Sequence, residues 1–141
     1  MGEEGCAVRV LVVDDHRNTR ESIAIGLTHF GYESDVAGSA VEAMSRLEER
    51  RYHWLICDVR MPGTNGVQLA VAARQRDTGL GVVLMTAYDV SAEERCTIES
   101  IDGVLVIKPV TAETLADLCA ARIGGPERYA IGKSIADRKR R

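Results

Sequence analysis

The stretch Trp54–Gly66, WLICDVRMPGTNG, decides the fold of this chain. It begins with the apolar run Trp54–Cys57, continues into the carboxylate of Asp58, and then turns at Pro62 and Gly63. An apolar run bounded by turn residues is typical of a buried strand that stops at the turn. We therefore expect Asp58 at the carboxyl end of a strand, the edge where open parallel α/β sheets bind their ligands.

Strand and helix signals alternate along the whole chain. Five apolar runs predict strands, and the segments between them carry apolar residues at helical spacing. The predicted strands are Val8–Val13, Tyr32–Ala37, Trp54–Asp58, Val82–Thr86 and Val104–Ile107. Such alternation indicates right-handed βαβ units and a parallel sheet inside one three-layer domain. Tyr32–Ala37 is less apolar than the other strands, which favours a place at the sheet edge.

Capping residues predict where the five helices begin. Asn18, Ser39 and Ser91 each precede a glutamate by three residues, the spacing of a capping box. Asn65 is expected to open the third helix, and the fifth is predicted to span Thr111–Ile123.

Length and charge limit the function classes. With 141 residues the chain is long enough for one domain with a hydrophobic core. The formal net charge is −3, but Pro126–Arg141 holds six Lys/Arg against two Asp/Glu. The preceding 125 residues therefore carry the negative charge, which argues against nucleic-acid binding by the main domain.

Cysteine spacing and hydropathy favour an ordinary cytoplasmic protein. The four cysteines lack the CxxC or other spacing of a metal site, and they are expected to be reduced, small apolar residues. No run of about 18 apolar residues predicts a membrane span. The amino terminus shows no basic-then-apolar secretory signal, so we expect a cytoplasmic location without a membrane partner.

Reactive side chains stand at the ends of four predicted strands, and in a parallel sheet those ends share one edge. They are Asp14, Asp15, Asp58, Thr86 and Lys108. Clustered carboxylates repel one another unless a cation lies among them. Mg²⁺ suits the cluster because it prefers oxygen ligands and typically takes one or two carboxylates together with a phosphate. A carboxylate beside the ion can act as a nucleophile and form an aspartyl phosphate, with a hydroxyl and an ammonium holding the phosphoryl group.

Four motifs in this order give the chain its family resemblance. They are Val12-Val13-Asp14-Asp15, Asp58-Val59-Arg60-Met61-Pro62-Gly63 with Gly66, Met85-Thr86-Ala87, and Lys108-Pro109. Together they resemble a response-regulator receiver domain, the phospho-accepting part of two-component signalling. The resemblance covers residues 7–123, leaving an N-terminal extension 1–6 and a basic tail 124–141 that is expected to be flexible. It implies a flavodoxin-like, doubly wound sheet of five parallel strands in the order 2-1-3-4-5.

The resemblance also assigns roles to the residues at the strand ends. It implies that Asp58 accepts the phosphoryl group, Thr86 is the switch hydroxyl and Lys108 is the phosphate-binding cation. It further implies that Asp14, Asp15, Asp58 and the backbone carbonyl of Arg60 bind Mg²⁺. The donor would be a sensor histidine kinase or a phosphotransfer protein. Beyond its own phosphorylation and dephosphorylation, such a domain is a signalling protein and not an enzyme.

Three positions depart from the family pattern. Many receivers carry Tyr or Phe three residues before the lysine, where this chain has Leu105, and Ile101-Asp102 replaces the usual Gly-Ala. Both changes fall in the region from the fourth helix to the fifth helix, the surface expected to bind a protein target or to form a homodimer. Tyr88 is either a substitute for the missing ring or a surface residue. Arg60 and Tyr88 flank Asp58, where they either shield the phosphoryl group or hinder its donor.

Three other readings remain open. A haloacid-dehalogenase-type phosphatase also uses Asp, Mg²⁺, Thr and Lys, but it needs a second Asp at position 60, where this chain has Arg60. A receiver-like module that acts without phosphorylation is the second reading, and Leu105 favours it. The third is the receiver part of a transcription regulator whose output domain lies outside this chain.

Overall fold

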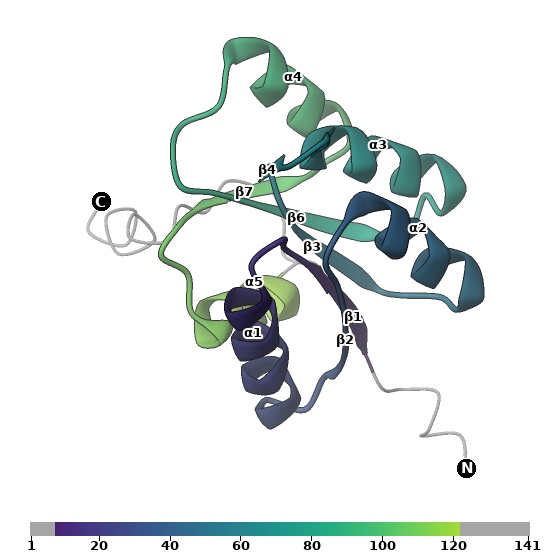
Figure 1. The fold of residues 1–141 in the computed structure, drawn as a ribbon, viewed down its shortest axis with the longest axis vertical. Coiled ribbons are helices and arrows are strands. Elements are labelled where there is room, and N and C mark those ends of the chain that lie inside the picture. Colours follow the sequence, from purple (N-terminus) through teal and green to yellow (C-terminus); the bar gives the residue numbers. More distant parts are fainter. Residues whose placement is uncertain (1–7, 122–141) are drawn as a thin grey trace.

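The computed structural model describes residues 8–121. Five of its strands form one parallel sheet in the order β2-β1-β3-β6-β7 (Figure 1). Their bounds are β1 Arg9–Val13, β2 Glu33–Ala37, β3 Trp54–Asp58, β6 Gly81–Thr86 and β7 Val104–Ile107. This is the predicted strand order with β2 at an edge, so the flavodoxin-like fold is confirmed. The predicted extension 1–6 and tail 124–141 lie outside the described residues, as does the predicted end of the fifth helix.

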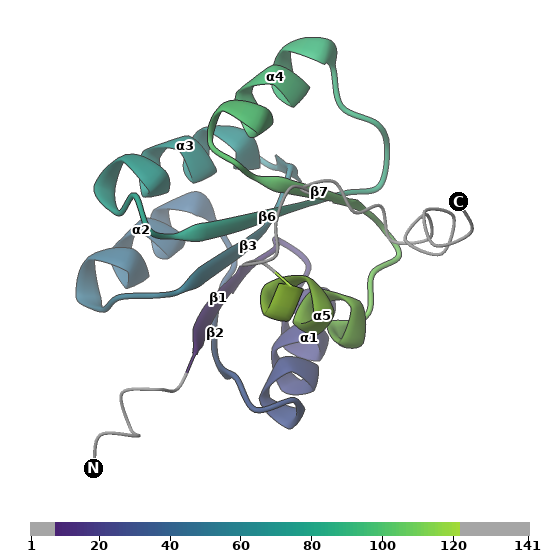
Figure 2. The ribbon, with the colours of Figure 1, turned by 180° about the vertical axis from the view of Figure 1, so that it is seen from behind.

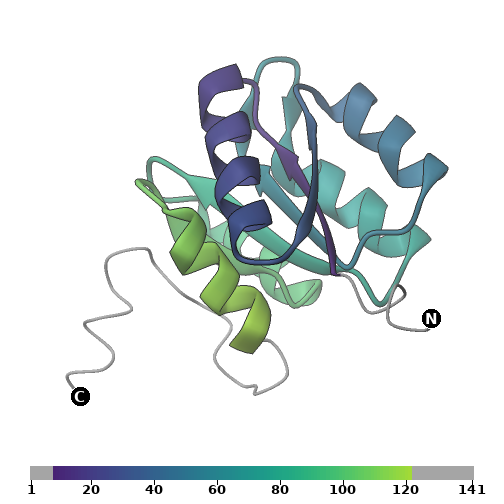
Figure 3. The same ribbon diagram turned by 90° about the horizontal axis from the view of Figure 1, so that it is seen from below.

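Helices cover both faces of the sheet. They are α1 Arg17–His29, α2 Ala40–Glu49, α3 Gly66–Arg76, α4 Ala92–Ser100 and α5 Ala112–Ala121. Figure 2 shows α1 and α5 side by side on one face, while α2, α3 and α4 pack in sequence on the other. The view in Figure 3 places the sheet between these two helical layers. None of the helices within residues 8–121 is long and apolar enough to cross a membrane.

The alternation of side chains along β1 and β3 divides the core into two halves. Val10 and Val12 of β1 pack with Leu27 of α1 and Leu115 of α5. The intervening residues of the strand point to the opposite face, where they meet α2, α3 and α4. Because both faces are covered, the strands other than the edge strand β2 are mainly apolar, as buried parallel strands are. Fully burying a side chain such as Leu27 contributes about 1.5–3 kcal/mol relative to leaving it exposed.

Helix caps confirm three of the predicted starts and correct one. Ser39, Asn65 and Ser91 accept backbone hydrogen bonds as N-caps of α2, α3 and α4. Ser91 and Glu94 form the complete reciprocal capping box. The predicted capping box at Asn18 is wrong, because α1 begins at Arg17 with His16 as its N-cap.

The chemistry at the start of α1 accounts for this correction. The Asp14 carboxylate accepts a hydrogen bond from the backbone N–H of His16 at 2.9 Å, so an acid before the helix satisfies that donor. Glu21 turns instead to Arg17, whose Nε lies 3.1 Å from its carboxylate. The predicted box at Ser39 is also incomplete, because Glu42 accepts from the N–H of Gly38 rather than from that of Ser39.

A short ribbon after β3 was not predicted. The strands β4 (Arg60–Met61) and β5 (Thr64–Asn65) pair antiparallel, with Arg60 opposite Asn65. Pro62 and Gly63 form the connecting turn, and Gly63 has a φ of +80°. A proline followed by a glycine with positive φ is the pattern of a type II turn. Because Arg60 is paired with Asn65 in this ribbon, the direction of its side chain is set by the ribbon.

Candidate functional site

Four of the predicted site residues meet at the carboxyl edge of the sheet. Asp58 ends β3, Thr86 ends β6, and Asp14 and Lys108 directly follow β1 and β7. The backbone holds them in place, since the N–H of Lys108 donates to the carbonyl of Thr86 at 2.8 Å. Asp14, Asp58 and Thr86 are buried polar residues of the described chain.

The ammonium of Lys108 bridges two carboxylates. Its Nζ lies 3.1 Å from Oδ2 of Asp14 and 3.3 Å from Oδ2 of Asp58. Burial is the main cause that raises the pKa of Asp58, and the charge of Asp14 adds to it while Lys108 opposes both. Burial would lower the pKa of Lys108, but its hydrogen bonds and attraction to the two acids outweigh that cost, so its pKa is raised. The site thus holds one cation between two buried acids.

Asp15 and His16 complete a group of ligand atoms around this edge. One ligand atom from each of Asp14, Asp15, His16 and Asp58 lies within 4.8 Å of all the others. The imidazole Nδ1 of His16 is 3.4 Å from an oxygen of Asp14 and of Asp15, although 71% of that side chain is exposed. Oδ1 of Asp15 is buried and has no hydrogen-bond partner. Oxygen-rich groups with an unsatisfied carboxylate oxygen fit a hard divalent cation such as Mg²⁺.

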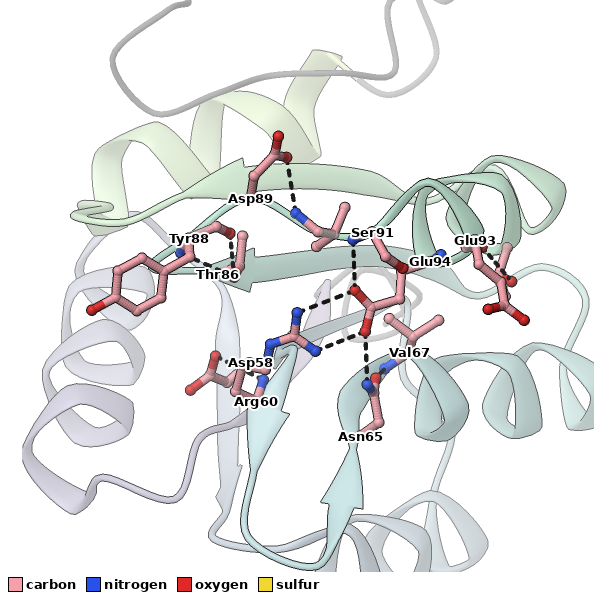
Figure 4. Close-up of polar contacts among 12 residues, drawn as sticks. Asp58, Arg60, Asn65, Val67, Thr86, Tyr88, Asp89, Ser91, Glu93 and Glu94 are labelled. Atoms are coloured by element: carbon pink, nitrogen blue, oxygen red, sulfur yellow. Dashed lines mark hydrogen bonds and ion pairs between the residues drawn. The ribbon is translucent and has the colours of Figure 1, made fainter.

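The hydroxyl of Thr86 is engaged by the loop that follows it. Thr86 Oγ1 donates to the carbonyl of Tyr88 at 2.6 Å and accepts from the Tyr88 N–H at 3.3 Å. The Tyr88 side chain is 77% exposed, and Figure 4 shows its ring pointing away from Thr86. Of the two readings for Tyr88, this arrangement favours the surface residue. Leu105, at the position of the missing aromatic ring, is only 2% exposed and packs in the core.

A second polar cluster, centred on Glu94, lies beside Asp58. The guanidinium of Arg60 donates to both carboxylate oxygens of Glu94, at 2.7 and 3.2 Å. The amide of Asn65 donates to the same carboxylate at 3.0 Å (Figure 4). The backbone N–H of Arg60 also lies 3.4 Å from Oδ1 of Asp58. The cluster therefore joins the β4–β5 ribbon, the first turn of α4 and the carboxylate at the end of β3.

Glu94 predicts a pH-dependent contribution to stability. Its hydrogen bonds from Arg60, Ser91 and Asn65 lower its pKa from 4.5 to about 2. A carboxylate whose pKa is lowered by folding stabilises the fold above its unfolded pKa, and that stability is lost as the pH falls toward the folded pKa. Since half of the Arg60 side chain is exposed, solvent screening limits the contribution to about 1 kcal/mol.

We therefore expect Glu94→Gln to lower the free energy of unfolding by about 1 kcal/mol near pH 7. The difference from the wild type should shrink between about pH 4.5 and pH 2, where the wild-type carboxylate becomes protonated. Urea denaturation across this range in chelator-containing buffer measures it, with Glu93→Gln as the matched control. A difference that stayed constant with pH would contradict the assignment.

The backbone of Asp58 leaves no room for a side chain at Gly66. A Cβ at this position would collide with the carbonyl oxygen of Asp58. Because the obstacle is backbone and cannot rotate away, Gly66→Ala should lower the free energy of unfolding by about 3 kcal/mol. Gly79→Ala is the control, since a Cβ there meets only the Asp77 side chain at 3.5 Å. Equal losses in the two variants, measured by chemical denaturation, would refute the close approach.

The fold and the acidic edge together define a flavodoxin-like α/β domain with a candidate cation site, and comparison with known proteins gives its family. Residues 10–120 match the family model of the response regulator receiver domain. The chain belongs to this family, which confirms the resemblance inferred from the four motifs.

Individual relatives support the same family. The response regulator protein FleR of Pseudomonas aeruginosa is 36% identical over 129 residues, which are 90% of this chain and 25% of FleR. The response regulator MprA of Mycobacterium bovis is 32% identical over 109 residues, 77% of this chain and 47% of MprA. The chain thus spans a quarter to about half of these relatives.

A solved structure of a response regulator is also similar to this chain in three dimensions. The response regulator protein TrrA from Thermotoga maritima, solved in complex with Mg²⁺-BeF, is 31% identical to this chain. It matches with a TM-score of 0.67 and covers 78% of this chain and 94% of TrrA.

Some members of the site were missed by sequence reasoning. Glu94 was recognised only as a helix cap, because nothing local shows that it reaches Arg60, 34 residues away. His16 was not among the predicted site residues, although its largely exposed side chain lies beside the acids. Its position directly after Asp14-Asp15 was the one available signal.

Proposed function

We propose that this domain accepts a phosphoryl group on Asp58 and passes the signal on through a change of its surface. The observation that supports this most is the bridge from Lys108 to Asp14 and Asp58 at a buried sheet edge. A buried carboxylate next to an ammonium can attack a phosphorus atom, while the ammonium neutralises charge on the phosphoryl oxygens.

The donor in this proposal is the phosphohistidine of a sensor histidine kinase or a phosphotransfer protein. A carboxylate oxygen of Asp58 forms the new O–P bond, and the N–P bond of the phosphohistidine breaks as its imidazole leaves. No net oxidation or reduction occurs. Burial and the charge of Asp14 raise the pKa of Asp58. A more basic carboxylate is a stronger nucleophile, so this environment suits Asp58 to the attack on phosphorus.

Asp14, Asp15 and Asp58 are the residues proposed to hold Mg²⁺, with the backbone carbonyl of Arg60 as a further ligand. Oδ1 of Asp15 accepts no hydrogen bond although it is buried, which supports the site. When bound, the ion offsets the charge that Asp14, Asp15 and the incoming phosphoryl group bring together. The residues of the chain do the rest: Lys108 binds phosphoryl oxygen, and the N–H of Arg60 orients the Asp58 carboxylate.

Thr86 is proposed as the switch. Phosphorylation replaces the single negative charge of the Asp58 carboxylate with about two on the phosphoryl group, whose strong acceptor oxygens compete for the Thr86 hydroxyl. Thr86 must then exchange its bond to the Tyr88 carbonyl for one to the phosphoryl group. This exchange pulls on the loop between β6 and α4, so that the surface of α4, β7 and α5 changes for a protein target or a second copy of the chain.

One observation favours a second candidate, a receiver-like module that acts without phosphorylation. Leu105 is packed in the core where an aromatic ring would complete the usual relay, and the Thr86 hydroxyl is already satisfied by Tyr88. In this second candidate function, the surface of α4, β7 and α5 has a single conformation and binds its target without phosphorylation of Asp58.

A phosphotransfer assay separates these candidates. The protein with Mg²⁺ is mixed with a phosphorylated histidine kinase domain or with acetyl phosphate, and intact mass is followed. We expect one added phosphoryl group that base and hydroxylamine remove, together with altered target binding or oligomeric state. Phosphorylation without any change in binding or oligomeric state would favour the second candidate. Steady turnover of a phosphate ester would overturn both in favour of a phosphatase.

A further inference from the structure

The Arg60 side chain is held away from Asp58 by a single partner. Its guanidinium forms two nearly parallel bonds with the Glu94 carboxylate, at 2.7 and 3.2 Å. Two-pronged pairing of this kind is the strong form of an arginine–carboxylate contact. Yet Arg60 starts only two residues after Asp58, and its own N–H lies 3.4 Å from Oδ1 of Asp58. One residue therefore connects the carboxylate at the end of β3 with the first turn of α4.

Glu94 does not need Arg60 to cap its helix. Its carboxylate also accepts from the backbone N–H of Ser91 at 2.9 Å and from Asn65 at 3.0 Å. In return, the N–H of Glu94 donates to the Ser91 hydroxyl at 3.0 Å. Figure 4 shows the Glu94 carboxylate bonded both to Arg60 and to the backbone of Ser91, so loss of the Arg60 contact would leave this capping box intact. The ion pair therefore joins α4 to the ribbon and is separate from what keeps α4 helical.

We propose that Arg60 is a second phosphoryl-binding cation, and that Glu94 is the positioning residue that holds it in reserve until a phosphoryl group reaches Asp58. The proposal rests on the proposed phosphorylation of Asp58 and deepens it. A phosphoryl group brings about two negative charges, against one on Glu94, and its oxygens suit the planar fork of a guanidinium. After the hydrogen bonds and charge of Glu94, the charge of Asp58 is among the influences that raise the pKa of Arg60, so the two groups already interact.

The exchange would transmit the signal to α4. When Arg60 moves from Glu94 to the phosphoryl oxygens, α4 loses its ion pair to the β4–β5 ribbon and keeps only the bond from Asn65. The first turn of α4 is then free to shift against the ribbon while remaining capped. This route does not pass through position 105, where Leu105 replaces the aromatic ring of many receivers. The exchange of Arg60 between Glu94 and the phosphoryl group would thus transmit phosphorylation to α4 without an aromatic residue at position 105.

Initial rates of phosphorylation by acetyl phosphate with Mg²⁺ test the reserve role. We expect Glu94→Gln to react about fivefold faster than the wild type, equivalent to about 1 kcal/mol in the barrier, because its Arg60 is free to bind the donor. Arg60→Gln should react more slowly than the wild type. The double variant should equal Arg60→Gln, because Glu94 acts only through Arg60. Glu93→Gln is the matched control and should keep the wild-type rate.

Two outcomes of the rate assay would overturn the proposal. One is a wild-type rate in Glu94→Gln, and the other is a double variant that exceeds Arg60→Gln by the same factor. A wild type that gains no base-labile phosphoryl group on Asp58 defeats the proposed function itself, and this inference with it.

A spectroscopic measurement on the wild type avoids reliance on variants. The Arg60 Nε–H signal and the amides of residues 92–95 are followed by NMR before and after phosphorylation. We expect both to shift, and we expect the amide shifts to be lost in Arg60→Gln although its Asp58 still becomes phosphorylated. An Arg60 signal that stays in place on the phosphorylated wild type would overturn the proposal, as would equal amide shifts in Arg60→Gln.

Discussion

Substitution of Asp58 by asparagine should abolish phosphoryl acceptance and leave the fold at least as stable as that of the wild type. The amide has no anionic oxygen to form an acyl phosphate, so loss of labelling should be complete. Stability should rise by up to about 1 kcal/mol, because burial and the charge of Asp14 disfavour the wild-type anion. Lys108 keeps its 3.1 Å contact with Asp14 in the variant. Intact mass after acetyl phosphate treatment and urea denaturation measure the two effects.

Asp89→Asn is the matched control for this prediction. Asp89 is exposed, lies in the loop after β6 and pairs with Arg95, so its loss should leave phosphorylation unchanged. Labelling that persists in Asp58→Asn would mean that another side chain is the acceptor. If the free energy of unfolding of Asp58→Asn were several kcal/mol lower than that of the wild type, the ion pair between Lys108 and Asp58 would have a mainly structural role.

Asp15→Asn should separate metal binding from folding more sharply than any other substitution in the cluster. Oδ1 of Asp15 has no hydrogen-bond partner, so little folding free energy depends on it in the absence of metal. As a proposed ligand, its loss should weaken Mg²⁺ binding at least about tenfold, the lower range for disturbing a metal site. Phosphorylation at a fixed, sub-saturating Mg²⁺ concentration should fall by about tenfold, and more Mg²⁺ should restore part of it.

Calorimetric titration of Mg²⁺ and denaturation in chelator check the two halves of this prediction. Glu21→Gln provides the control, because Glu21 is a nearby acid on α1 that pairs with Arg17. Unchanged Mg²⁺ affinity in Asp15→Asn would place the metal elsewhere. Strong destabilisation without metal would mean that Asp15 has a structural role.

The parallel sheet and its edge could be predicted because they depend on local patterns. Strands buried on both faces are apolar throughout, and each one ends where a polar or turn residue begins. Once the strands are parallel, their carboxyl ends must share an edge, which is why the sequence alone predicts Asp14, Asp58, Thr86 and Lys108 together. The burial of three of them and the bridge from Lys108 agree with that expectation.

The features that escaped prediction depend on pairings between distant residues or on competing local ones. Arg60 and Glu94 meet only because the β4–β5 ribbon and the start of α4 lie together in space. The start of α1 was misplaced because the Asp14 carboxylate binds the N–H of His16 and the chain is already helical at Asn18, where Arg20 donates to the carbonyl of His16. The ribbon itself had a local signal in Pro62 and Gly63, but a turn pattern alone does not show that its flanks will pair.

Peptide mapping of the phosphorylated wild-type protein tests the central proposal most directly. The protein is phosphorylated with Mg²⁺ and a phosphorylated kinase domain, and the acyl phosphate is trapped chemically before digestion. We predict that the modification lies on Asp58 alone, in the peptide that contains Trp54–Gly66, and that hydroxylamine removes the phosphoryl group before trapping. A phosphoryl group on a serine, threonine or histidine, stable to hydroxylamine, would contradict the proposal.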